Sequence, residues 1–144
     1  YDSHSRLKAY MVALNHLYKK EKALWENDSD WEGFKWINSD DYLKNELSFI
    51  RYSRSKRSFI VVICNFSGAD IDSYSVGVPK AGQYDVILHS ADEAFGGKVK
   101  DKLACKTTKE ECDGFENRIT LDVPAFSTIY LKRRTGAKSG NKPL

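Results

Sequence analysis

The sequence is poor in cysteine and has no long hydrophobic run. It holds three cysteines in 144 residues, and an odd, low count is typical of a reducing compartment. A membrane-spanning helix needs about 20 consecutive apolar residues, which no segment offers. The polar first residues are not followed by the apolar core of a signal peptide. We therefore expect a cytoplasmic protein that does not bind membranes.

An excess of one charge is also lacking. The 23 lysines and arginines are balanced by 20 acidic residues, for a net charge of +3. This balance does not favour nucleic acid as a partner. Hydrophobic residues make up 41% of the chain, and seven Phe, eight Tyr and three Trp are present. These numbers indicate a packed core in one domain, or in one domain with an appendage.

The cysteine positions allow one disulfide. Cys105 and Cys112 are close enough in sequence to face each other across a hairpin, although a reducing compartment disfavours a disulfide. Cys64 lies in the apolar run FIVVICNF and is expected to be a small core residue. No cysteines or histidines have the spacing of zinc ligands.

One long helical pattern is present, at residues 4–25. Its apolar side chains recur at steps of three and four, which places them on one stripe of a helix. They are Leu7, Tyr10, Met11, Leu14, Leu17 and Tyr18. Because an isolated helix gains most of its stability from packing of such a stripe, the stripe must be buried on something.

The rest of the chain has the pattern of short strands. Phe34 and Trp36 should share one face of a strand at 34–37, with Lys35 on the other face. The runs at 47–53 and 58–66 form a plausible hairpin through the turn RSKR. The second run is apolar on both faces, as a central strand is.

Further alternating segments complete the pattern. They lie at 74–78, 84–88, 119–123 and 128–131, with a weaker one at 103–108. Seven or so short strands separated by turns predict a mainly β fold, an antiparallel β-sandwich, preceded by one long helix. The polar tail from residue 134 is expected to be mobile.

Pairs of groups that carry catalysis are missing. His4 and His16 lie about three turns apart on the helix, too far to cooperate. His89 is followed closely by Ser90 and Asp92, but Ser/His/Asp sites are not built from sequence neighbours. These residues are expected to close a turn at the end of a strand.

The acidic pairs lie in polar loops, where solvated carboxylates are the expectation. They are Asp28 with Asp30, Asp40 with Asp41, and Glu110 with Glu111. Glycoside chemistry instead needs two carboxyl groups facing each other across a sugar site.

Two further sequence motifs do not indicate a functional site. Gly96 and Gly97 are not followed by the Lys-Ser/Thr of a phosphate loop. Asn27 and Asn65 begin glycosylation patterns, which a cytosolic protein would not use.

Three tryptophans lie close together in a polar segment, at positions 25, 31 and 36. Sugar rings stack on exposed aromatic faces, because their C–H faces are apolar. The alternative is that these side chains cover the junction between helix and sandwich, since large aromatics are usually mostly buried.

The order and spacing of several segments is similar to a known family. A His is followed by a helix with Leu-Asn-x-Leu-Tyr, an acidic stretch, Gly-Phe-x-Trp-Ile and an Asp. These are His4, Leu14, Asn15, Leu17, Tyr18, Gly33, Phe34, Trp36, Ile37 and Asp41. The likeness continues through SFIRYS, VVICNFS, YSVGVPKAGQYDVILHSADEAFGG and RITLDVPAFSTIYLKR. Over about residues 1–133 the chain resembles bacterial glycogen branching enzymes, the 1,4-α-glucan branching enzymes of the α-amylase superfamily.

The resemblance implies a domain division. Residues 1–30 would be the last helix and exit loop of a catalytic (β/α)₈ barrel, and 31–133 the C-terminal β-sandwich of the α-amylase all-β type. Residues 134–144 would be a flexible tail. The chain departs from the family between Lys98 and Asn117, where a Gly- and Asn-rich loop and a His-Gly-Arg stretch are usual.

The resemblance also implies a function. The whole enzyme would cut an α-1,4-glucan chain and rejoin it through an α-1,6 bond, by double displacement with net retention. The family's catalytic carboxylates lie in the barrel, so this fragment is expected to be inactive alone. No metal or organic cofactor is implied.

The module itself would support the barrel and is a candidate to hold glycogen chains. Trp36 is the first candidate for glucan binding, followed by Trp31 and Tyr42. Two alternatives remain: an independent α-glucan-binding module, or the C-terminal domain of an α-amylase-type hydrolase. The order of the segments favours branching.

Overall fold

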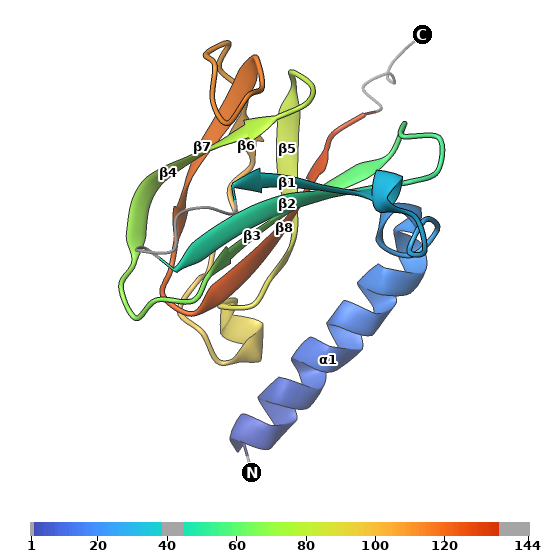
Figure 1. Ribbon diagram of the computed structural model, residues 1–144. Helices are drawn as coiled ribbons and strands as arrows, with labels where there is room; N and C mark the ends of the chain where they lie inside the picture. Colours follow the sequence, from blue (N-terminus) through green and yellow to red (C-terminus); the bar gives the residue numbers. More distant parts are fainter. Residues whose placement is uncertain (1, 39–44, 136–144) are drawn as a thin grey trace, which may run out of the picture.

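The computed structural model describes residues 2–38 and 45–135 (Figure 1). It begins with helix α1 (Asp2–Lys20) and two short 3-10 turns, η1 (Lys22–Leu24) and η2 (Trp31–Gly33). A third 3-10 turn, η3 (Glu93–Phe95), follows strand β5. The strands are β1 (Phe34–Asn38), β2 (Glu46–Tyr52), β3 (Phe59–Asn65), β4 (Ile71–Val78), β5 (Gln83–His89), β6 (Cys105–Lys106), β7 (Asn117–Val123) and β8 (Ser127–Arg133).

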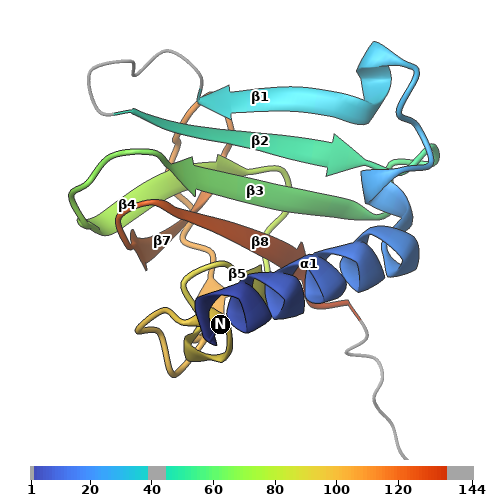
Figure 2. The same cartoon turned by 90° about the horizontal axis from the view of Figure 1, so that it is seen from below.

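The strands form two antiparallel sheets. Within the described residues, one sheet has six strands in the order β1-β2-β3-β8-β5-β6, and the other pairs β4 with β7. Figure 2 shows α1 lying across the outer face of the larger sheet, near β8 and β5. The expected mainly β sandwich with one preceding helix is confirmed.

Strand β3 lies in the middle of the larger sheet, between β2 and β8. All seven of its residues are buried, which confirms the central strand expected from its two apolar faces. Phe59, Val61 and Ile63 point into the sandwich. Ile60, Val62 and Cys64 point to the outer face, where they form a second cluster with Ala23 of the 3-10 turn η1.

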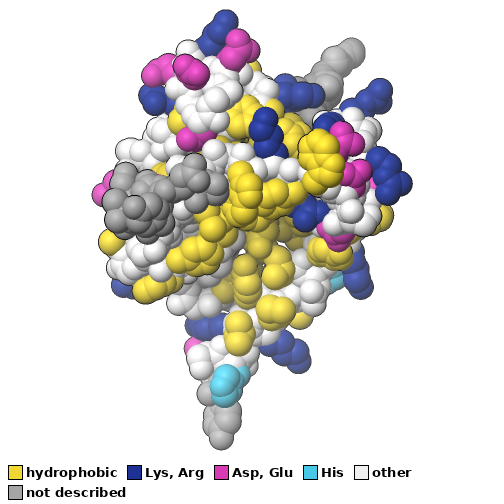
Figure 3. All heavy atoms as spheres, viewed as in Figure 1, with side chains coloured by type: hydrophobic (Ala, Val, Ile, Leu, Met, Phe, Trp, Pro, Cys, Tyr) yellow, Lys and Arg dark blue, Asp and Glu magenta, His cyan; other side chains and the backbone are white. Residues whose placement is uncertain are grey.

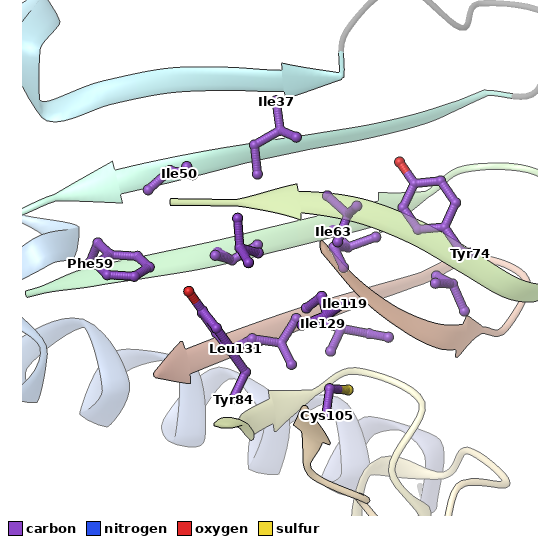
Figure 4. Close-up of a cluster of buried hydrophobic side chains, with 14 residues drawn as sticks. Ile37, Ile50, Phe59, Ile63, Tyr74, Tyr84, Cys105, Ile119, Ile129 and Leu131 are labelled. Atoms are coloured by element: carbon purple, nitrogen blue, oxygen red, sulfur yellow. The ribbon is translucent and has the colours of Figure 1, made fainter. Parts of the chain in front are cut away.

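The main core lies between the two sheets (Figure 4). Ile50, Ile63 and Leu131 of the larger sheet meet Val76 and Ile119 of the smaller one. All five are at most 1% exposed. Their burial is the principal stabilising contribution to the sandwich, because apolar area removed from water stabilises in proportion to its size.

A polar side chain, Asn65, joins the end of β3 to the end of β7 and to the loops that follow these two strands. Its Nδ2 donates to the carbonyl oxygens of Ala69, Val123 and Pro124, at 2.9, 3.2 and 3.1 Å. Its Oδ1 accepts from the backbone N–H and the hydroxyl of Ser67, at 2.9 and 2.8 Å. The side chain is fully buried, so the folded protein cannot present this amide for glycosylation.

The strand expected at 103–108 is only two residues long. Cys105 and Lys106 pair with β5, and the N–H of Thr107 still bonds to Gly82 O at 2.9 Å. The N–H of Thr108 turns instead to Arg118 O on β7, at 2.9 Å. The expectation of one continuous strand was wrong because this segment crosses from one sheet to the other.

The helix ends at Lys20, five residues before the end expected from its pattern. Its last turn is followed by Glu21, a buried carboxylate that pairs with Lys132 Nζ of β8 at 2.7 Å. Near its other end, Arg6 Nη1 donates to Glu93 O at 2.9 Å. Tyr10 meets Phe95 edge-to-face, with ring centroids 5.3 Å apart. The helix is therefore fixed to the sandwich at both ends.

Only part of the apolar stripe of the helix is covered. Leu17 is buried, and Tyr10 and Leu14 are half-buried on the sandwich side. Leu7, Met11 and Tyr18 remain exposed. One edge of the stripe is therefore buried on the sandwich, and the rest of it is exposed. No helix in the described part of the chain is long and apolar enough to cross a membrane.

Candidate functional site

Three aromatic rings form a cluster on the outer face of β1 and β2. The strands are antiparallel with Trp36 opposite Phe49, which brings their rings to 6.0 Å. Phe34 stacks on Phe49 at 5.0 Å and meets Trp36 edge-to-face at 4.8 Å. As expected, Phe34 and Trp36 share a face, while Lys35 lies on the other, over the ring of Phe115.

This cluster continues into the exposed part of the helix. Figure 3 shows hydrophobic side chains gathered over the front of β1 to β3 and continuing onto α1. We call this surface the apolar face, and define it by Leu7, Met11, Tyr18, Phe34, Trp36 and Phe49. Monomeric proteins rarely expose a contiguous apolar surface of this kind, and where one occurs it commonly marks an interaction site.

Polar contacts fix the segment between the helix and β1. Arg51 of β2 pairs with Asp28 and donates to Leu24 O. Arg54 Nη2 donates to the carbonyl oxygen of Glu26 at 3.0 Å, and its backbone N–H to the carboxylate of Glu26 at 2.8 Å. These contacts hold the tryptophan-bearing segment on the β2–β3 hairpin.

Two of the three expected glucan-binding residues lie within the described part of the chain. Trp36 is 50% exposed within the aromatic cluster, and Trp31 is 82% exposed on η2. No ring contact joins them within the described residues. Tyr42 lies outside the described residues. Sequence patterns missed the part played by Phe49, since only the β1–β2 register places it beside Trp36.

The other candidate residues have structural roles. Asp30 Oδ1 accepts from the N–H of Glu32 at 3.1 Å and begins η2. Glu110 pairs with Arg118 at 2.9 Å. A Cβ on Gly97 would lie 1.9 Å from Ala91 O, so this glycine permits a close turn rather than phosphate binding. His4 and His16 are exposed on the helix.

All three cysteines are free thiols, so the Cys105–Cys112 disulfide left open by the sequence is not formed. Cys105 and Cys64 are buried, and burial raises the pKa of both thiols. Cys112 Sγ donates to Asp113 Oδ2 at 3.4 Å. Burial, followed by this neighbouring carboxylate, raises the pKa of Cys112 to about 11.

His89 closes a turn at the end of β5, as its position in the sequence predicts. Its Nδ1 accepts from the N–H of Ala91 at 3.1 Å, and the side chain is 5% exposed. Burial lowers the pKa of His89, while the charge of Asp92 opposes this and that of Lys102 adds to it. The neutral imidazole is therefore the form that the fold stabilises.

We expect a stability loss in mild acid that depends on His89. Because the folded-state pKa is lowered, its stabilising effect is complete above the unfolded value of about 6.5 and is lost as the pH falls through the folded value. The free energy of unfolding should fall with pH by up to ~1.4 kcal/mol per pH unit from this group. Urea titrations at several pH values between 7.5 and 5 give the free energy of unfolding at each pH. Plotted against pH, this free energy should have a shallower slope for His89→Gln than for the wild type. Parallel slopes would contradict the prediction.

Residues 2–38 and 45–135 contain no cluster of three or more His, Cys, Asp or Glu side chains able to hold a metal ion. The same ranges bring together no pair of catalytic groups at the apolar face, whose defining residues are all apolar or aromatic. This surface is therefore suited to packing and stacking rather than to acid–base chemistry.

Comparison with known proteins agrees with the resemblance seen in the sequence. A 1,4-alpha-glucan branching enzyme GlgB of Synechocystis sp. is 38% identical over 142 residues, covering 97% of this chain and 18% of its own length. GlgB of Francisella tularensis subsp. mediasiatica is 37% identical, covering 92% of this chain and 21% of its own length. GlgB of Clostridium perfringens is 36% identical, covering 92% and 20%.

The chain thus spans about a fifth of the length of these relatives. The family described as the α-amylase C-terminal all-β domain matches residues 36–134. That range begins inside β1 and ends just after β8, so it covers both sheets and leaves out the helix. The chain belongs to the family of α-amylase C-terminal all-β domains.

Proposed function

We propose that this chain is the C-terminal module of a 1,4-α-glucan branching enzyme of glycogen biosynthesis, in the cytoplasm. Residues 1–30 would be the last helix and exit loop of the catalytic barrel, 31–133 the β-sandwich domain and 134–144 a tail. The relatives support this proposal, since each is named as such an enzyme and matches nearly the whole chain.

The complete enzyme would transfer an α-1,4-glucan segment onto another chain through an α-1,6 bond. Its catalytic carboxylates would lie in the barrel, so the 144-residue chain alone should release no branched product. A branching assay with amylose separates this proposal from the alternative of a hydrolase. A complete enzyme that only shortens amylose, without forming α-1,6 bonds, would contradict it.

The module's own role is to pack against the catalytic barrel and support it. The observation that carries this role is the apolar face, which stays open to solvent in the isolated chain (Figure 3). Burying large apolar side chains stabilises by about 25 cal/mol per Å². Helix and sheet both contribute to the face, so one docked surface would fix the position of both.

Met11 and Val12 offer a matched test of this role. Their side chains are 46% and 47% exposed, but they point about 100° apart around the helix. We would replace the matching segment of the Synechocystis enzyme with this chain and measure the branching activity and thermal unfolding of the resulting chimera. Met11→Asp should lower activity at least ~10-fold, the effect of about 1.4 kcal/mol at a buried contact, whereas Val12→Asp should change little.

The same two variants in the isolated 144-residue chain serve as the control. Both sites are exposed there, so both substitutions should leave its unfolding nearly unchanged. Equal effects of the two variants in the chimera would contradict packing through the apolar face.

A second role is holding glucan chains on aromatic side chains, with Trp31, Trp36 and Tyr42 as the candidate residues. Trp36 belongs to the apolar face, so it would bind glucan only where that face is not packed on the barrel, whereas Trp31 lies outside the face. The observation that favours it is the 82% exposure of Trp31, because a large aromatic in water offers a face for a sugar ring. Native gels with embedded glycogen should retard the chain. Trp31→Ala or Trp36→Ala should reduce this retardation.

Phe126 provides the matched control for the gels, since it is 73% exposed and lies in the turn between β7 and β8. Phe126→Ala should migrate like the wild type. Equal retardation of all variants would remove the tryptophans as glucan-binding residues.

A further inference from the structure

A cleft opens at the edge of the sandwich, away from the aromatic cluster of the apolar face. It lies between β5 and the β4–β7 pair and is bounded by the segment 99–105. Its volume is about 460 Å³, which is within the range of small-ligand sites. A second hollow of about 550 Å³ shares Val99, Asp122 and Pro124 with it. The two hollows therefore lie next to each other.

His89 presents a hydrogen-bond donor to this cleft. Because its Nδ1 accepts from the N–H of Ala91, the neutral imidazole carries its proton on Nε2. Among the described residues no acceptor pairs with Nε2, yet this atom is not sealed from solvent. The side chain is 5% exposed and lines the cleft. A mostly buried donor without a protein partner points to an acceptor that comes from outside the chain.

The other polar groups in the cleft fit a neutral ligand. Asp101 and Asp122 line it, and the Asp122 carboxylate already accepts from the N–H of Ser73 at 2.9 Å. Two negative charges at the cleft repel an anion. Lys102 is already paired with Asp92, at 2.5 Å, so its charge is largely neutralised. Donor and acceptor groups are thus present without a net positive charge that would select phosphate.

The walls between these polar groups are aliphatic. Val86, Leu121 and Pro124 line the cleft, as do Ser73 and Thr120. The Thr120 hydroxyl is already hydrogen-bonded to that of Ser75 at 3.0 Å, so the aliphatic side chains are the surface left for a ligand. A pyranose ring has the matching surface, with apolar C–H faces and hydroxyl groups around its rim. Such a ring can contact the aliphatic walls while its hydroxyls reach His89 and the carboxylates.

We propose that this cleft binds a glucosyl unit of an α-glucan chain, with His89 Nε2–H donating to one sugar hydroxyl and Asp101 accepting from another. The identity of the sugar rests on the proposed function. The site is separate from Trp31 and Trp36, so a long glucan chain would have a second point of attachment on the module.

The test is an amide NMR titration of the 144-residue chain with maltoheptaose, and in parallel with inorganic phosphate. We expect maltoheptaose to shift the amide signals of Ser73, Ala91 and Thr120. His89→Leu should raise the dissociation constant obtained from these shifts about fivefold, the effect of losing one hydrogen bond of about 1 kcal/mol. Asp101→Ala should do the same, and because this loop residue is exposed, its loss does not threaten the fold. Trp31→Ala should leave the cleft response unchanged.

Other outcomes would overturn the proposal in different ways. Shifts confined to the surroundings of Trp31 and Trp36 would remove the cleft as a sugar site but keep glucan binding by the module. A response of the cleft to phosphate alone would show that the ligand class is wrong. No response to maltoheptaose at any amide would remove both glucan sites, whereas the packing role would still be decided by the Met11 and Val12 chimeras.

Discussion

Replacing Asn65 with leucine should lower the free energy of unfolding by about 3 kcal/mol, because several buried polar groups lose their partners at once. The amide donates to the carbonyl oxygens of Val123 and Pro124, at the end of the smaller sheet. Leucine has a similar volume but no polar atom, so these oxygens would stay buried without a donor. Urea denaturation of the variant and the wild type measures the difference.

The adjacent residue supplies the control. Phe66 is exposed, and Phe66→Ala should change the free energy of unfolding by less than about 0.5 kcal/mol. Ser67→Ala removes one hydroxyl that donates to Asn65 Oδ1. Its loss in the free energy of unfolding should lie between those of the other two variants, at about 1 kcal/mol. If Asn65→Leu were as stable as Phe66→Ala, the hydrogen bonds of Asn65 would not be what joins the two sheets.

Replacing Lys132 with methionine should destabilise the protein by about 2 kcal/mol, because it leaves the carboxylate of Glu21 without its cation. Glu21 is 4% exposed, whereas the side chain of Lys132 is 37% exposed. The expected effect is therefore below the 3–5 kcal/mol of a fully buried pair. The variant should also exchange its α1 amides faster, since this pair fixes the end of the helix.

A double-mutant cycle isolates the pair. Glu21→Leu combined with Lys132→Met removes both charges, and this double variant should recover most of the lost stability. Arg134→Met breaks the exposed pair with Asp85 and should have little effect on stability. Additive losses from the two single variants at Glu21 and Lys132 would contradict a coupled ion pair. Unchanged α1 exchange in Lys132→Met would show that the helix is held by its apolar contacts alone.

The helix is held by contacts that span the chain, and this matters for the proposed packing on a barrel. Arg6 reaches Glu93 and Glu21 reaches Lys132, so both ends are fixed to elements late in the sequence. A helix fixed in this way presents Leu7, Met11 and Tyr18 at a constant angle to the aromatic cluster. Loss of the Lys132 contact should therefore weaken the packing role as well as the stability of the isolated chain.

The sequence by itself determined the elements and their class. Two apolar runs joined by a turn predicted the strands at 47–53 and 58–66, and alternation with a period of two predicted the strand at 119–123, all within a residue or two. Apolar side chains at steps of three and four predicted the helix. The apolar pattern on both faces of residues 58–66 also placed that strand in the middle of a sheet. These features follow from residues that are neighbours in sequence, since side-chain direction depends on local backbone geometry.

Only the tertiary structure decided which of these surfaces and polar groups acquire a role. The buried edge of the helix stripe, the ring of Phe49 beside Trp36 and the crossing of residues 103–108 depend on strand register. The same is true of Asn65, which begins a glycosylation pattern in the sequence but bonds to Val123 and Pro124 in the fold. Register joins residues dozens of positions apart, and no local pattern contains that information.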